Sequence, residues 1–162
     1  MTTVFIWFAT DGVGHTSMQI GDQYVSYWPG GGGANAKKDF KIGQTHEPHF
    51  MSQYRGDVRA EGRTADREVR LAHLDEAAVL VAWREIKATA PRYNMRKHNC
   101  STVVAMLIEV GSGQSAPFVP EVDLRKYASS GILWIITRMA AFGGSIRMWS
   151  PEAVYRYALS VR

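Results

Sequence analysis

HTSMQIGDQYVSYWP, residues 15–29, holds two runs of strand-forming side chains on either side of a short turn. The runs are residues 15–20 and 24–28, and Gly21-Asp22-Gln23 joins them. A short connection that contains glycine is typical of a hairpin between antiparallel strands. The stretch therefore predicts a β-hairpin. Pro29 ends it, because proline has no backbone N–H to offer a sheet.

The neighbouring segments extend this hairpin into a sheet. Residues 3–9 form a β-branched and aromatic run that predicts a buried strand, and residues 10–14 form a turn. Residues 67–74 alternate apolar and polar side chains, which predicts a further strand. The polar segment 36–66 between them gives no assignment beyond loops and one short strand.

The second half of the chain is typical of helices. Asp75 and Asn99 are favoured N-cap residues that precede runs with apolar side chains at helical spacing. The predicted helices are residues 76–90, a run from Cys100 that stops at Gly111, residues 132–142, and a last helix that starts at Ser150-Pro151 and runs through Leu159. Together these patterns predict an α+β fold with a small antiparallel sheet packed against helices, in one domain over residues 1–162.

Composition and charge exclude several classes of protein. The 162 residues are 46% hydrophobic and 21% charged, as in an ordinary globular domain and unlike a disordered, collagen-like or coiled-coil chain. The formal net charge of +4 is too mild to predict a nucleic-acid binder. Arg92, Arg96 and Lys97 beside Tyr93 are accordingly interpreted as a solvated loop.

Two apolar segments were compared with a secretory signal and with a membrane-spanning helix. Residues 1–9 lack the cationic start and the cleavage site of a secretory signal, so we expect synthesis in the cytoplasm without a signal peptide. Residues 132–142 are the most apolar stretch, but they are shorter than the roughly 18–20 residues of a membrane-spanning helix and contain Arg138. We interpret them as a buried helix, and no stable membrane insertion is predicted.

Cys100 is the only cysteine, which excludes an internal disulfide and a four-cysteine zinc site. It is either a buried hydrophobe or a nucleophile. Its predicted place in the first turn of a helix favours the nucleophile, because the positive end of a helix lowers the pKa of a thiol. The backbone N–H of Cys100 would also face the oxygen of a tetrahedral intermediate.

Two histidines are candidate bases for this thiol. His15 follows Gly12-Val13-Gly14, which leaves room for close approach to the backbone, and it opens a strand with one buried face. His98 is two residues from Cys100, but it precedes the helix cap and would need a tight turn to reach the sulfur. His15 is therefore the preferred base.

The other three histidines carry no predicted chemistry. His46 and His49 could form a ligand pair, but Pro48 prevents a regular helix and no third ligand follows at a familiar spacing. We interpret both as surface-loop residues, and His73, which alternates with core positions, as a packed side chain. Neither a metal nor a cofactor is predicted.

Residues 14–17 and 24–29, with Tyr93-Asn94 and residues 98–102, resemble a known family. The pattern is similar to the circularly permuted branch of the papain-like cysteine hydrolases, which includes NlpC-type amidase relatives and lecithin:retinol acyltransferase-like proteins. In that branch the histidine precedes the cysteine, as His15 precedes Cys100 here. The resemblance covers roughly residues 1–30 and 92–111.

The resemblance implies a third polar residue that orients the imidazole from the strand after the histidine. The matching position is Ser26. Histidine, asparagine, glutamine or an acid is more usual there, so serine is a departure from the family pattern. Gln19, Asp22 or Gln23 could take the role instead.

The implied activity is that of a cysteine peptidase or amidase. Cys100 would attack a carbonyl, His15 would serve as base and then as acid, and a thioester would be resolved by water. The implied substrates are peptidoglycan peptides or a target protein. The implied setting is a bacterial effector or toxin exported by a specialised machine such as type VI secretion, with an immunity or secretion partner.

Two alternatives stay open. One is an acyltransferase or lipase-like enzyme of the lecithin:retinol acyltransferase type, for which residues 132–142 would supply an apolar surface. That family's usual Asn-Cys-Glu-His run is absent here, because Ser101-Thr102 follow Cys100. The other is a non-catalytic binding module in which Cys100 is an inert buried thiol.

Overall fold

The computed structural model describes residues 1–10, 13–30, 44–123 and 145–162. This part of the chain contains four helices and small antiparallel sheets, so the predicted α+β class is confirmed. The predicted helix at residues 132–142 lies outside the described residues.

The main sheet has four antiparallel strands in the order β3-β2-β1-β7. Their bounds are β1 Thr2–Trp7, β2 His15–Ile20, β3 Gln23–Val25 and β7 Arg67–Leu71. The predicted hairpin is confirmed as β2 and β3. The register pairs Trp7, the last residue of β1, with His15, the first residue of β2, so the candidate base lies at one end of the central strands.

Three pairs of short strands surround this sheet. They are β4 Tyr27–Pro29 with β6 Pro48–Phe50, β5 Thr45–His46 with β8 Tyr93–Asn94, and β9 Glu121–Asp123 with β10 Ser145–Arg147. The predicted strand at residues 24–28 is therefore divided at Ser26. Before Ser26 the chain pairs with β2, and after it with β6.

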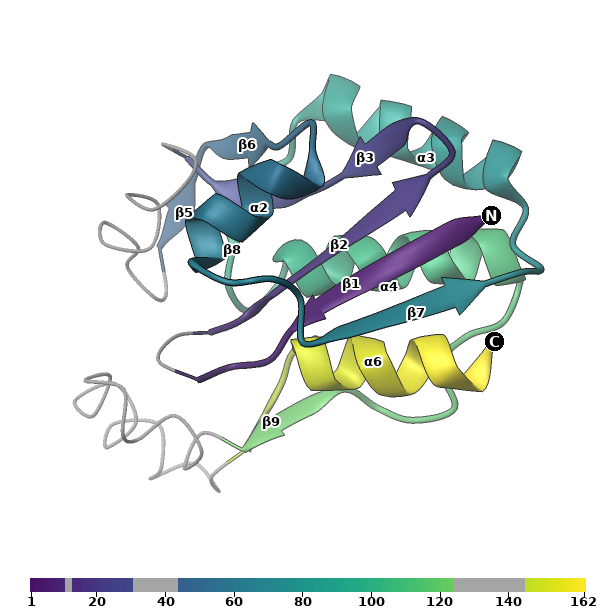
Figure 1. Cartoon of the computed structure of the whole chain (residues 1–162). Coiled ribbons are helices and arrows are strands. Elements are labelled where there is room, and N and C mark those ends of the chain that lie inside the picture. Colours follow the sequence, from purple (N-terminus) through teal and green to yellow (C-terminus); the bar gives the residue numbers. More distant parts are fainter. Residues whose placement is uncertain (11–12, 31–43, 124–144) are drawn as a thin grey trace.

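The helices lie on both faces of the main sheet (Figure 1). They are α2 Tyr54–Glu61, α3 Glu76–Thr89, α4 Cys100–Ser112 and α6 Pro151–Ser160. Helix α4 contacts β2, α6 contacts β1 and β7, and α3 packs on α4. Helix α2 lies on the opposite face, where the Tyr54 ring contacts Phe5 and Trp7 of β1.

The hydrophobic core lies between the sheet and α3, α4 and α6. Val4 and Ile6 of β1 and Met18 of β2 are fully buried there with Leu107 and Ile108 of α4. Because strand side chains alternate between faces, the intervening residues of β1 and β2 point toward α2. The sheet thus separates an apolar core from the polar cluster that surrounds His15.

Helix α4 begins as predicted and ends later than predicted. Asn99 caps it, since its side-chain oxygen accepts the backbone N–H of Thr102 at 2.8 Å. Gly111 does not stop the helix but lies buried inside it. A Cβ atom there would come within 2.6 Å of a methyl group of Val79, so glycine allows α3 to approach closely, and Gly113, with φ of 65°, ends the helix.

Two other expectations differ from the structure. Strand β7 ends at Leu71, so His73 lies beyond it and is exposed rather than packed. The segment predicted to be loops and one short strand forms β5, β6 and helix α2. That helix has few apolar side chains, which left no periodicity to detect. The last helix begins at Pro151 with Ser150 as its cap, as predicted.

Among the described residues, none of the helices has both the length and the apolar character that crossing a membrane requires.

Candidate active site

Cys100 is the first residue of α4, and only 7% of it is exposed. The backbone N–H of Thr16 donates to its sulfur, and the Ser101 hydroxyl oxygen lies 4.0 Å from that sulfur. The positive end of the helix dipole also faces the thiol. Each of these groups stabilises a negative charge on sulfur. The predicted place of Cys100 in a first helical turn is confirmed.

His15 is brought to this thiol by the chain reversal that precedes β2. Gly14 has φ of 70°, a conformation that favours glycine. A Cβ atom at Gly14 would lie 2.4 Å from the backbone oxygen of Trp7, so a larger residue would force β1 and β2 apart at the position of His15. Glycine is therefore required immediately before the candidate base.

Two indole rings hold the imidazole of His15, which is only 2% exposed. Trp28 stacks on it with ring centroids 4.3 Å apart and an interplanar angle of 29°. The Trp7 ring is tilted by 46° with its centroid 5.5 Å away. This packing fixes the plane of the ring, so its two nitrogens face defined partners.

The partner on one side of the imidazole is Asp57 of α2. Its Oδ2 lies 3.1 Å from Nε2 of His15. Because Nε2 is engaged there, Nδ1 is the nitrogen left to face Cys100, with whose sulfur the ring is hydrogen-bonded. The three side chains therefore form a relay in the order thiol, imidazole, carboxylate.

Asp57 is fully buried, yet both of its oxygens are satisfied. Oδ2 accepts the Tyr24 hydroxyl at 2.6 Å as well as the imidazole N–H. Oδ1 accepts the Ser26 hydroxyl at 2.7 Å and the indole N–H of Trp28 at 2.8 Å. Four donors converge on one carboxylate and stabilise its negative charge.

The electrostatics of the three groups reinforce one another. Burial would lower the pKa of His15, but the negative charges of Asp57 and Cys100 and their hydrogen bonds outweigh it and raise that pKa to about 10. Burial would raise the pKa of Cys100, but the imidazolium and the hydrogen bonds to the sulfur lower it below its ordinary value. Burial would likewise raise the pKa of Asp57, and His15 and the hydroxyl donors hold it low. These shifts all favour a thiolate and an imidazolium backed by a carboxylate.

Ser26, the predicted third residue, does lie beside His15. Its hydroxyl oxygen is 3.3 Å from Nε2, but the hydroxyl donates to Asp57 and accepts from the Trp28 indole at 3.0 Å. The structure brings Ser26 to the imidazole as a support for the carboxylate, and Asp57 is the orienting group that the sequence did not indicate. In the sequence, Asp57 is one acidic residue within the polar segment 36–66, and nothing there distinguishes it as a partner of His15.

The other candidates for the third role face elsewhere. The Gln19 amide donates to the backbone oxygens of Gly21 and Gln23 within the hairpin turn, at 2.7 and 3.1 Å. Asp22 and Gln23 are exposed in that turn. The structure brings none of these three side chains to His15.

The remaining histidines lie apart from the relay. His98 packs edge-on against Tyr27 with centroids 5.3 Å apart, and burial lowers its pKa. His46 and His49 lie in β5 and β6, and His49 is exposed. The part of the chain that the structure describes contains no cluster of three or more histidine, cysteine or acidic side chains suited to a metal ion.

Two further donors converge near the thiol. The backbone N–H of Cys100 donates to the hydroxyl oxygen of Tyr93. That hydroxyl donates to the Met95 thioether at 3.9 Å and also contacts the Cys100 sulfur. Burial raises the pKa of Tyr93 well above its ordinary value, so the hydroxyl keeps its proton and remains a donor. A carbonyl oxygen placed here would meet both N–H and O–H groups.

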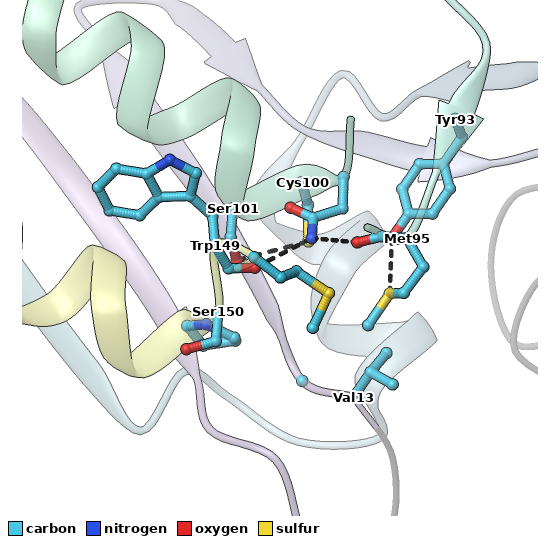
Figure 2. Close-up of a pocket in the computed structure, with 11 residues that line it drawn as sticks. Val13, Tyr93, Met95, Cys100, Ser101, Trp149 and Ser150 are labelled. Carbon is cyan, nitrogen blue, oxygen red and sulfur yellow. Dashed lines mark hydrogen bonds between the residues drawn. The ribbon is translucent and has the colours of Figure 1, made fainter. Parts of the chain in front are cut away.

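The thiol lies at the base of a pocket of about 250 Å³, a volume that includes its open mouth. In Figure 2, Tyr93 and Met95 stand on one side of Cys100, and Trp149 stands on the other. The lining in the described residues is completed by Val13, Gly14, Asn99, Ser101, Met148, Ser150 and Pro151. Cys100 therefore borders the pocket, whereas His15 and Asp57 are not among its lining residues.

No protein-family model matches the chain, and no match was found among curated proteins or solved structures.

Proposed function

We propose that this protein is a cysteine hydrolase of the peptidase or amidase type, with a circularly permuted papain-like arrangement. Cys100 is the nucleophile, His15 the general base and acid, and Asp57 the residue that orients and charges the imidazole. The observation that carries the proposal is the buried relay itself. A thiol at a helix start is hydrogen-bonded to an imidazole, whose other nitrogen lies 3.1 Å from a fully buried carboxylate.

A core histidine needs no such arrangement. A buried carboxylate and imidazole cost free energy of desolvation, and a structural site of this size could be filled by apolar side chains at no loss of stability. Perturbed ionisable groups next to a pocket are typical of catalytic sites. The open side of the sulfur faces that pocket, where a carbonyl carbon could approach.

The chemistry follows from the positions of the protons. The Cys100 thiolate attacks the carbonyl carbon of an amide, and the oxygen takes up the negative charge between the Cys100 N–H and the Tyr93 hydroxyl. The His15 imidazolium then donates its proton to the departing amine, and the C–N bond breaks to leave a thioester. The neutral imidazole accepts a proton from water, which attacks the thioester and releases the acid and the thiolate.

A test of this proposal uses p-nitrophenyl acetate, whose acyl group is small and reacts readily with thiolates. We expect a burst of one nitrophenolate per chain, followed by slower turnover, and intact mass should locate an acetyl group on Cys100. Cys100→Ala should show neither burst nor adduct, while His49→Ala, a variant of an exposed histidine, should behave as wild type. A wild-type protein that acquires no acetyl group would identify an inert thiol and favour the binding module.

A further inference from the structure

The surface of the pocket above Cys100 is mainly apolar, with neutral polar groups from Tyr93, Asn99, Ser101 and Ser150. Met95 and Met148 contribute thioether side chains, Trp149 an indole, and Val13 and Pro151 aliphatic groups. None of the described lining residues is an aspartate, glutamate, histidine, lysine or arginine. A group bound here would lose its contact with water and gain contacts with carbon and sulfur, which favours an apolar group.

The two walls of this pocket are held at a fixed separation by one side chain. The amide nitrogen of Asn99 donates to the backbone oxygen of Met95 at 2.7 Å and to that of Trp149 at 3.0 Å. Asn99 is only 2% exposed, and its oxygen caps α4 at the same time. Asn99 therefore links both walls to the start of α4, where the thiol lies.

The buried charges beside the pocket also disfavour an anionic acyl group. The Cys100 thiolate, the His15 imidazolium and the Asp57 carboxylate carry one net negative charge. An anionic acyl group in the pocket would be repelled by that charge, and the described lining offers it no cation. A carboxylate would also lose its hydration without a partner, which is costly.

We infer that the site accepts acyl groups that are uncharged and apolar, and that it discriminates against acyl groups that carry a carboxylate. The inference rests on the proposed function and names its substrate class. Because the proposed function is that of a peptidase or amidase, the apolar acyl group is that of an amino-acid residue in a peptide.

The experiment measures the rate at which Cys100 is acylated by four p-nitrophenyl esters of N-acetyl amino acids. Leucine supplies the apolar group, glutamine a neutral polar one, glutamate its anionic counterpart and lysine a cation. We expect the leucine ester to react about 10–100-fold faster than the glutamate ester, with glutamine between them. A p-nitrophenyl octanoate arm tests a lipid source and should be slower than the leucine ester.

A matched pair of variants assigns the preference to the pocket. Met95→Lys places a cation in the lining. It should lower the ratio of the leucine-ester rate to the glutamate-ester rate at least about fivefold. Met106→Lys makes the same change on α4 at a residue that is 43% exposed and outside the pocket lining, so it should leave the ratio unchanged. An equal shift in both variants would show an effect of net charge alone and would overturn the assignment.

The outcomes separate the two proposals. Acylation of Cys100 by all esters at similar rates, or fastest by the glutamate ester, would overturn the inference and leave the cysteine hydrolase in place. Fastest acylation by octanoate would replace a peptide with a lipid as the source of the acyl group. Absence of acylation by every ester, with the fold intact by circular dichroism, would overturn the proposed function itself.

Discussion

Asp57→Ala is expected to lower the free energy of unfolding by about 3–5 kcal/mol, the range seen when one member of a buried charged pair is removed. The alanine would leave four buried donors without their acceptor: the imidazole of His15, the hydroxyls of Tyr24 and Ser26, and the indole of Trp28. Urea denaturation at pH 7 measures the loss. Asp22→Ala, in an exposed turn, is the control and should change stability by less than about 0.5 kcal/mol.

Asp57→Asn tests the contribution of the negative charge while keeping the size of the side chain. An amide of the same size keeps one acceptor oxygen but removes the negative charge, so the pKa of His15 should fall and the pKa of Cys100 should rise. We expect acylation by p-nitrophenyl acetate at pH 7 to slow by about 10–1,000-fold while the protein remains folded. Unchanged acylation by a folded Asp57→Asn protein would remove Asp57 from the mechanism.

His15→Gln should reduce turnover of p-nitrophenyl acetate by about 100–10,000-fold, the usual contribution of a general base. Glutamine can place an amide N–H near the position of Nε2 and so keep a donor for Asp57, but it cannot take up a proton. The loss should therefore appear in kcat and in thiol reactivity more than in folding. Steady-state kinetics and a urea titration measure the two effects separately.

The control for this variant is His49→Gln, which makes the same change at an exposed histidine. It should retain wild-type turnover. Equal turnover by His15→Gln and wild type would show that the imidazole serves only packing between Trp7 and Trp28, and the relay would have no catalytic meaning.

Features with local signals could be predicted from the sequence. The hairpin of β2 and β3 follows from a glycine-containing turn between strand-forming runs, and α4 follows from Asn99 before helically spaced apolar residues. These signals also placed Cys100 in a first helical turn and His15 at the start of a strand. Both positions are confirmed because each depends on residues within one turn of the chain.

Helix α2 and Asp57 could not be predicted, because their structure depends on distant contacts. Few residues of Tyr54–Glu61 are apolar, and the helix is held mainly by Tyr54 against the β1 rings and by the donors around Asp57. Asp57 is 42 positions from His15 in sequence. Nothing in the local sequence marks this carboxylate, and only the folded sheet brings the two together.

The prediction of Ser26 placed a polar side chain beside His15, and the structure adds Asp57 to that position. The family resemblance implied a place beside His15, and the Ser26 hydroxyl oxygen lies 3.3 Å from Nε2. The acceptor that holds the imidazole comes from another element, and the serine hydroxyl supports that acceptor. A short polar side chain on the strand leaves space that a carboxylate from α2 occupies.

The most direct test of the central claim is the rate of alkylation of Cys100 by iodoacetamide as a function of pH, in the wild type and in His15→Gln. The pKa of the thiol is lowered by the imidazolium, which persists until the pH approaches about 10, so wild-type alkylation should rise through a midpoint well below the ordinary thiol value of about 8.5. In His15→Gln that midpoint should move up by at least about one pH unit. A midpoint at or above the ordinary value that is the same in both proteins would contradict the thiolate–imidazolium pair and the hydrolase built on it.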